Sequence, residues 1–139
     1  MKEEEICKCG HRRFHHKISD SSCKFCECDT YRWDISLKKY SKTLSKVFEK
    51  CPPEKYGGCM IATRMLIEEH PELKEKIYHL GTIKHSVGEL PDGRIIDTQL
   101  FQIGLIRDLK GKEHKIVFEK EEFDTLMKDG SYNYLNNEV

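Results

Sequence analysis

Cysteine and histidine are concentrated near the start of the chain, in a stretch that has few aliphatic residues. Five of the seven cysteines lie between Cys7 and Cys28, and three histidines lie among them. The cysteines are odd in number and clustered rather than spread in pairs, which indicates a metal site in a reducing compartment rather than a disulfide scaffold. The sequence therefore predicts a metal-binding module over residues 1–34 and a packed globular unit over residues 35–139.

The spacing of these residues is typical of zinc ligands. They form the pattern Cys-x-Cys-Gly-His, then a His-His pair, then Cys-x-x-Cys-x-Cys. Zinc prefers four thiolate or imidazole ligands in a tetrahedron, and closely spaced cysteines allow one turn to supply two of them. We therefore expect one structural Zn²⁺ in a zinc-ribbon-like module, whose removal by chelation melts residues 1–34. Which four residues bind is open, and the candidates rank in the order Cys23 and Cys26, Cys9 and Cys7, His16, and Cys28.

The charge and hydropathy of the chain argue against functions driven by charge or by membranes. Lys plus Arg and Asp plus Glu both number 24, so the formal net charge is zero. This removes the simplest electrostatic case for a nucleic-acid binder. The basic stretch from His11 to Lys17 is compatible with phosphate contacts, but we interpret it as a solvated loop, so nucleic acid is a possible partner that is not favoured.

Membrane insertion and secretion are not expected either. No run approaches the roughly 18 apolar residues of a membrane span, and the acidic start from Met1 to Glu5 does not resemble a secretory signal. We expect no membrane partner and a cytoplasmic location.

Two segments after residue 34 have the apolar spacing of helices. The first covers residues 36–50, with Ser36 as its N-cap, and stops before a Pro-Pro pair. The second runs from Cys59 to Glu69 after a Gly-Gly pair. Pro71 either ends this helix or opens a short further helix over residues 72–77.

The pattern then changes to that of strands. Residues 82–90 and 94–101 flank a Pro-Asp-Gly turn, residues 103–109 and 114–119 form a second hairpin, and a helix over 121–128 is capped by Gly130. This order predicts an α+β fold in which helices pack on an antiparallel sheet.

The start of the second helix is a candidate catalytic position. Cys59 follows Gly57 and Gly58 and opens the helix, where the positive end of the macrodipole lowers the pKa of a thiol. Backbone N–H groups at the same place are suited to stabilise an oxyanion. The pattern favours a nucleophilic thiol at Cys59.

The first hairpin brings a histidine and an aspartate together. A three-residue loop with Gly93 in the left-handed conformation pairs Leu90 with Arg94. Val87 then lies opposite Asp97 and His85 opposite Gln99, all four on one face of the sheet. Asp97 is diagonal to His85 and within reach of a hydrogen bond, whereas a two-residue loop would place it on the other face.

The order of these residues resembles the papain-like cysteine hydrolase superfamily, most closely its transglutaminase-like branch. Gly-Gly-Cys at a helix start, followed by the strand, turn and strand of residues 85–98, carries the resemblance, which covers roughly residues 55–105. It implies a papain-like core and a catalytic triad in which Cys59 is the nucleophile, His85 the general base and Asp97 the group that orients it.

These observations predict a cysteine-dependent hydrolase or acyltransferase, cysteine protease-like or transglutaminase-like, that acts on an amide, isopeptide or thioester bond of a peptide or protein substrate. The alternative is a non-enzymatic zinc-binding interaction module on an inactive papain-like scaffold, with the three residues in structural roles. Thiol redox chemistry through Cys51 and Cys59 ranks last, because the spacing is not Cys-x-x-Cys.

Three further residues of the body have open roles. Gln99 is either an oxyanion donor or a packing residue. His79 and His114 are alternative bases without a well-placed acid, and we interpret both as structural.

Overall fold

The computed structural model describes residues 3–52, 58–80, 83–100 and 114–128. The elements are η1 (Arg13–His15), η2 (Ile35–Tyr40), α1 (Ser41–Lys50), α2 (Cys59–Glu69), β1 (Lys74–Leu80), β2 (Ile83–Glu89), β3 (Ile95–Ile96) and β4 (Val117–Phe118). A further helix covers residues 120–128. The strands form one antiparallel sheet in the order β1-β2-β3-β4, so the fold is α+β, as predicted.

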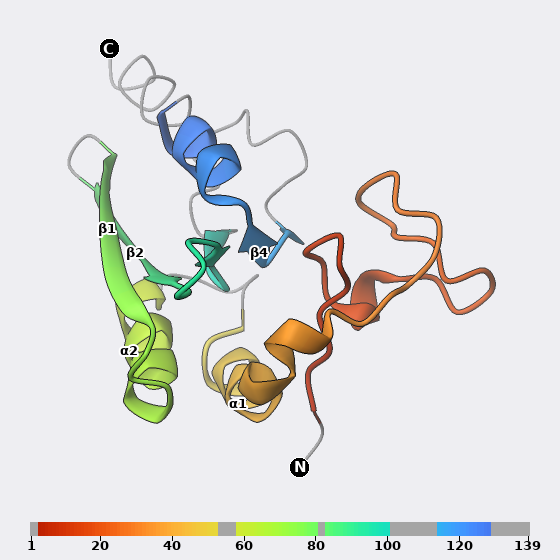
Figure 1. Cartoon of the computed structure of the whole chain (residues 1–139), viewed down its shortest axis with the longest axis horizontal. Coiled ribbons are helices and arrows are strands. Elements are labelled where there is room, and N and C mark those ends of the chain that lie inside the picture. The colour runs from red at the N-terminus through yellow and green to blue at the C-terminus, as the bar shows by residue number, and fades with distance from the viewer. Residues whose placement is uncertain (1–2, 53–57, 81–82, 101–113, 129–139) are drawn as a thin grey trace.

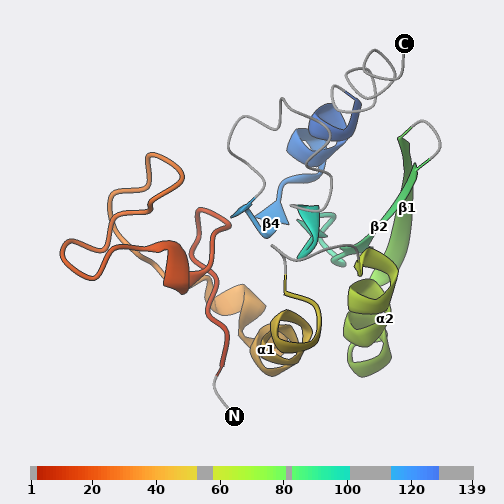
Figure 2. The same cartoon turned by 180° about the vertical axis from the view of Figure 1, so that it is seen from behind.

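The sheet separates two layers of helices. In Figures 1 and 2, α1 and α2 lie below the short strands β3 and β4, and the helix over 120–128 lies above them. The strands alternate accordingly: Ile96 and Val117 pack with α1 and α2, whereas Ile95 and Phe118 pack with the C-terminal helix. Period-2 alternation therefore builds two hydrophobic clusters on opposite faces of one sheet.

The N-terminal segment is a set of loops that projects from one side of this body (Figure 1). Its root is anchored, because Ile6 is buried in the same cluster as Leu44 of α1. The guanidinium carbon of Arg12 lies 3.9 Å from the centre of the Phe48 ring. His11 forms an isolated β-bridge with Lys115, next to β4. The loops thus pack on the body through apolar, cation–π and backbone contacts.

The hairpin turn has the predicted register. Gly88 pairs with Ile96 and Glu89 with Ile95, and the Leu90 N–H donates to the Arg94 carbonyl over 2.8 Å. Gly93 has a φ of +94°, which an L side chain rarely adopts. Turn chemistry alone is therefore sufficient to fix which residues share a face with His85.

Three expectations need correction. The short helix over residues 72–77 was one of two options and is wrong, because residues from Lys74 onward form edge strand β1, paired along its length with β2. The first helix begins as 3-10 helix η2, and its N-cap is Asp34, whose carboxylate accepts from the Ser36 N–H. Within the described residues, the strand expected over 94–101 is regular only at Ile95–Ile96.

The other expected elements either agree with the structure or lie outside the described residues. Helix α2 has the predicted bounds, and the final helix begins one residue earlier than expected. The strand expected over 114–119 is regular at Val117–Phe118. The strand expected over 103–109, Gly57 and the Gly130 cap lie outside the described residues.

Gly10 joins the N-terminal loops to the sheet, and its substitution should be costly. It has a φ of +88°, and a Cβ there would lie 2.3 Å from the Val117 carbonyl oxygen. Gly93 has a similar φ but nothing within 4 Å of the corresponding position. We expect Gly10→Ala to lower the free energy of unfolding by about 3 kcal/mol and Gly93→Ala by about 1 kcal/mol, measured by denaturant unfolding. Equal losses would show that the close approach of Gly10 to β4 is absent.

Candidate functional site

Cys59 is held at the first position of α2 by close packing of the residues around it. Gly58 is the N-cap, and a Cβ there would lie 3.1 Å from the Cys51 sulfur. The Gln99 side-chain amide donates to the Cys51 carbonyl over 2.8 Å. The C-terminal end of α1 and the N-terminal start of α2 are thus fixed relative to the segment after β3. This fixes the position of the Cys59 thiol.

His85 and Asp97 form a buried hydrogen-bonded pair. The distance from His85 Nε2 to Asp97 Oδ2 is 2.6 Å, and the two residues are 0% and 2% exposed. Asp97 Oδ1 accepts from the Gln99 N–H over 2.9 Å, so both carboxylate oxygens have a partner. The acid is therefore fixed in place and in turn fixes the orientation of the imidazole.

The imidazole also contacts Cys59 through a side-chain hydrogen bond. Since Asp97 occupies Nε2, Nδ1 is the ring nitrogen left to face the sulfur. Cys59 is only 9% exposed. The three residues that sequence analysis assigned to a triad therefore meet in one buried chain, from thiol to imidazole to carboxylate.

The surroundings of His85 favour its protonated form. Burial disfavours the charge, but the Asp97 carboxylate and the hydrogen bonds with Asp97 and Cys59 outweigh it and raise the pKa of His85 to about 10, from an ordinary value of 6.5. An imidazolium beside a sulfur stabilises the thiolate, which is the nucleophilic form of cysteine. The arrangement is able to generate a thiolate at neutral pH.

The other residues considered for this chemistry lie elsewhere or have other partners. The Gln99 NH₂ is used by the Cys51 carbonyl and the Thr98 hydroxyl, which favours a packing role. The His114 ring stacks on Phe25 of the N-terminal loops with centroids 4.1 Å apart. His79 is exposed on edge strand β1.

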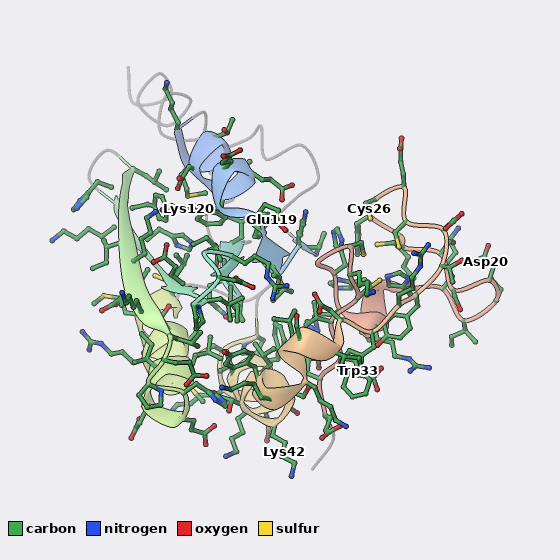
Figure 3. All side chains as sticks on the ribbon, viewed as in Figure 1. Asp20, Cys26, Trp33, Lys42, Glu119 and Lys120 are labelled. Carbon is green, nitrogen blue, oxygen red and sulfur yellow. The ribbon has the colours of Figure 1, made fainter. Side chains whose placement is uncertain are left out.

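A second cluster of reactive side chains lies in the N-terminal loops, where Cys26 is labelled in Figure 3. The ligand atoms form two groups, each with all atoms within 4.8 Å of one another: Cys7, Cys9, His16 and Cys28, and Cys9, His11, Cys23 and Cys26. All seven cysteines of the chain are free thiols. Each group could hold a metal ion.

All six residues ranked by sequence analysis fall into these two groups, and His11 joins them. His11 was recognised as part of the cluster but not ranked as a ligand. Its side chain is buried and its backbone pairs with Lys115, a contact between residues distant in sequence that no local pattern shows. The third histidine, His15, is in neither group and packs against Phe25 with ring centroids 4.8 Å apart.

Backbone N–H groups surround the sulfur atoms of the cluster. The Phe25 N–H donates to the Cys23 sulfur over 3.4 Å and the Arg32 N–H to the Cys7 sulfur over 3.3 Å. The Cys28 thiol instead donates to the Thr30 carbonyl over 3.2 Å, and a further backbone hydrogen bond reaches the Cys9 sulfur from His11. Backbone N–H donors stabilise thiolates and orient them, as they do around metal-bound cysteines.

Without a cation, the cluster is electrostatically unfavourable for a thiolate at Cys9. Burial raises the pKa of the Cys9 thiol far above its ordinary value, and negative charge at Cys7 and Cys26 raises it further. Burial also lowers the pKa of His11 to about 4, helped by the nearby Lys115. The histidine is thus neutral, the form that binds metals, and a cation would offset the charge of the sulfurs.

The basic stretch from His11 to Lys17 is largely neutralised within the fold. The Arg12 guanidinium lies 2.6 Å from a Glu4 carboxylate oxygen, and that of Arg13 lies 3.1 Å from Glu5. The stretch is only partly the solvated loop expected from the sequence, because Arg13, Phe14 and Lys17 are exposed, whereas the three histidines, His11, His15 and His16, are buried.

Comparisons with protein-family models, with curated proteins and with solved structures gave no match for this chain. Within the described residues, no helix has the length and apolar character needed to cross a bilayer.

Replacement of Asp97 tests the electrostatics of the triad. Because the folded-state pKa of His85 is raised from 6.5 to about 10, its protonation stabilises the fold fully below about pH 6.5, and this stabilisation is lost as the pH rises toward 10. In Asp97→Asn we expect the His85 pKa to fall, followed by NMR of the ring nitrogens, and this pH dependence of unfolding to flatten.

Asp92→Asn is the matched control, since Asp92 is an exposed carboxylate of the hairpin turn that pairs with Arg94. Its His85 titration should equal that of the unchanged protein. If the Asp97 variant titrated like this control, the proposed electrostatic role of Asp97 would be wrong.

Proposed function

We propose that this protein is a cysteine-dependent hydrolase or acyltransferase acting on an amide, isopeptide or thioester bond of a peptide or protein substrate. The observation that carries the proposal is the buried chain of hydrogen bonds from Cys59 through His85 to Asp97. Such an arrangement activates a nucleophile and orients its base.

The chemistry follows from the proton positions. The Cys59 thiolate attacks the substrate carbonyl carbon, and a carbon–sulfur bond forms. His85 Nδ1 gives its proton to the leaving amine or thiolate as the bond to that group breaks. Water or an acceptor amine then attacks the acyl-enzyme, His85 takes up its proton, and the Cys59 thiolate is released. Asp97 keeps Nε2 protonated and the ring in place throughout.

The start of α2 supplies a second element of this mechanism. The first intrahelical hydrogen bond runs from the Ala62 N–H to the Gly58 carbonyl, so the backbone N–H groups of the first turn point toward the N-terminal end of the helix. They lie at the positive end of the helix dipole, beside the thiol. An oxyanion formed during attack at Cys59 would be stabilised there.

The energetics of burial also favour a functional role over a structural one. Removing a charged pair from water costs several kcal/mol per ion, and well-packed apolar residues of similar volume often give equal or greater stability. A fully buried His85–Asp97 pair is therefore weakly explained by stability alone. The contact of this pair with a cysteine at the start of a helix supports a catalytic role for the three residues.

The N-terminal loops are the structural part of this proposal. A Cys/His cluster without disulfides fits Zn²⁺, which prefers closed sites of thiolates and imidazoles. Metal binding replaces the aliphatic core that these loops lack.

The second candidate function is a non-enzymatic zinc-binding interaction module. One observation favours it: Phe14 and Ile18, on the loops around the cluster, are 72% and 103% exposed. Exposed apolar side chains of this kind are suited to contact another protein.

Thiol labelling separates the two candidates. We expect an electrophilic acyl probe at pH 7 to label Cys59 roughly tenfold faster than an ordinary thiol. Cys59 would be present mainly as the thiolate at this pH, whereas only a few per cent of an ordinary thiol is ionised. Labelling at this site should disappear in Cys59→Ala and slow by about tenfold or more in His85→Ala, measured by peptide mass spectrometry.

Cys51, the other buried thiol outside the N-terminal cluster, is the internal reference. His79→Ala, which removes an exposed histidine of β1, should leave labelling of Cys59 unchanged. Labelling of Cys59 at the rate of Cys51 would contradict the hydrolase and leave the interaction module.

Removal of the metal tests the structural role of the loops. A chelator should increase amide hydrogen exchange over residues 6–33, whose hydrogen bonds depend on the cluster. Exchange in β1 and β2, which pair over Lys74–Leu80 and Ile83–Glu89, should change little. Exchange that is unaffected in the loops would show that no metal holds them.

A further inference from the structure

The two groups of metal-ligating side chains share one residue. Cys7, His16 and Cys28 belong only to the first group, and His11, Cys23 and Cys26 only to the second, while Cys9 belongs to both. A tetrahedral ion takes four ligands. Seven side chains therefore exceed one ion by three, and they supply two ions if Cys9 serves both.

The distances within the cluster are those of ligands around tetrahedral ions. With zinc–sulfur bonds near 2.3 Å and zinc–nitrogen bonds near 2.0–2.1 Å, two sulfurs on one ion lie about 3.8 Å apart and a sulfur and a nitrogen about 3.6 Å. The Cys7 and Cys28 sulfurs are 3.8 Å apart. The Cys9 sulfur is 3.5 Å from His16 Nε2 and 3.6 Å from His11 Nδ1.

The Cys9 sulfur thus lies between two imidazoles, one from each group. His16 is oriented by its other nitrogen, since Nδ1 donates to the Ser21 carbonyl over 2.5 Å and leaves Nε2 facing Cys9. Metal-bound histidines usually donate their other ring nitrogen to a carbonyl or carboxylate in this way. His11 faces Cys9 from the opposite group with Nδ1, while its Nε2 is buried without a hydrogen-bond partner in the described part of the chain.

Charge also favours two ions over one. The cluster contains five cysteines and two histidines, and histidine binds metals in its uncharged form. If all five sulfurs are thiolates, one divalent ion leaves three negative charges in a partly buried site, whereas two leave one. A single remaining charge costs less to keep in a partly buried site than three do.

We propose that the Cys9 thiolate bridges two Zn²⁺ ions. One ion is completed by Cys7, His16 and Cys28, and the other by His11, Cys23 and Cys26. Binding releases the protons of the five thiols. The inference rests on the metal binding proposed above and is independent of the chemistry at Cys59.

The full-length protein, reduced and loaded anaerobically, provides the first test. We expect two zinc ions per chain by elemental analysis and by native mass spectrometry. When loaded with ¹¹³Cd²⁺, the protein should give two cadmium resonances that are scalar-coupled to each other, because one sulfur atom joins the two ions. This measurement needs no substitution and so does not depend on the folding of a variant.

Substitutions then assign the ligands. Cys26 is exposed and belongs only to the second group, so Cys26→Ser should reduce the ion count from two to one in the presence of a competing chelator. The remaining ¹¹³Cd resonance should lose its coupling. Cys51→Ala, which removes a cysteine outside the cluster, should retain two coupled ions.

Each other outcome would overturn a specific part of this proposal. One ion per chain, or two ions without coupling, refutes the bridge but leaves a metal-stabilised module. Two ions in Cys26→Ser refute the assignment of the second group. A chain that binds no zinc refutes both the bridge and the structural metal.

Discussion

The short hydrogen bond between His85 and Asp97 is the interaction on which the candidate active site depends. It lies in the interior, 2.6 Å long, and connects the segment after β3 to the middle of β2. The same carboxylate accepts the Gln99 N–H, and Gln99 in turn binds the end of α1 beside Gly58. One buried acid therefore sets the imidazole, and its neighbours set the start of α2, where Cys59 faces that imidazole.

The body and the N-terminal loops depend on different kinds of interaction. The body buries apolar side chains on both faces of a short antiparallel sheet. The N-terminal loops contain few aliphatic residues and instead bring cysteine and histidine side chains together. The cysteines repel one another when they are ionised, unless a cation lies between them. No triad residue belongs to either ligand group, so the structural role proposed for the metal and the catalytic role proposed for the triad involve separate residues.

Sequence reasoning succeeded where structure is determined locally. The Pro-Asp-Gly turn fixes the hairpin register, and the register places Asp97 on the His85 face. It failed where distant contacts decide. Lys74–Leu80 is charged and lacks a strong strand pattern, yet pairing with β2 makes it an edge strand. The ligand role suggested for His11 depends on packing against Lys115, which spacing within the cluster does not reveal. Catalytic and metal roles themselves stay predictions.

The pH dependence of Cys59 alkylation tests the central claim most directly. If His85 and Asp97 hold Cys59 as a thiolate, its alkylation rate should already be at its plateau at pH 7 and should decline only at more acidic pH. An ordinary thiol, with a pKa near about 8.5, would instead gain close to tenfold in rate per pH unit up to that value. That second profile at Cys59 would contradict the account.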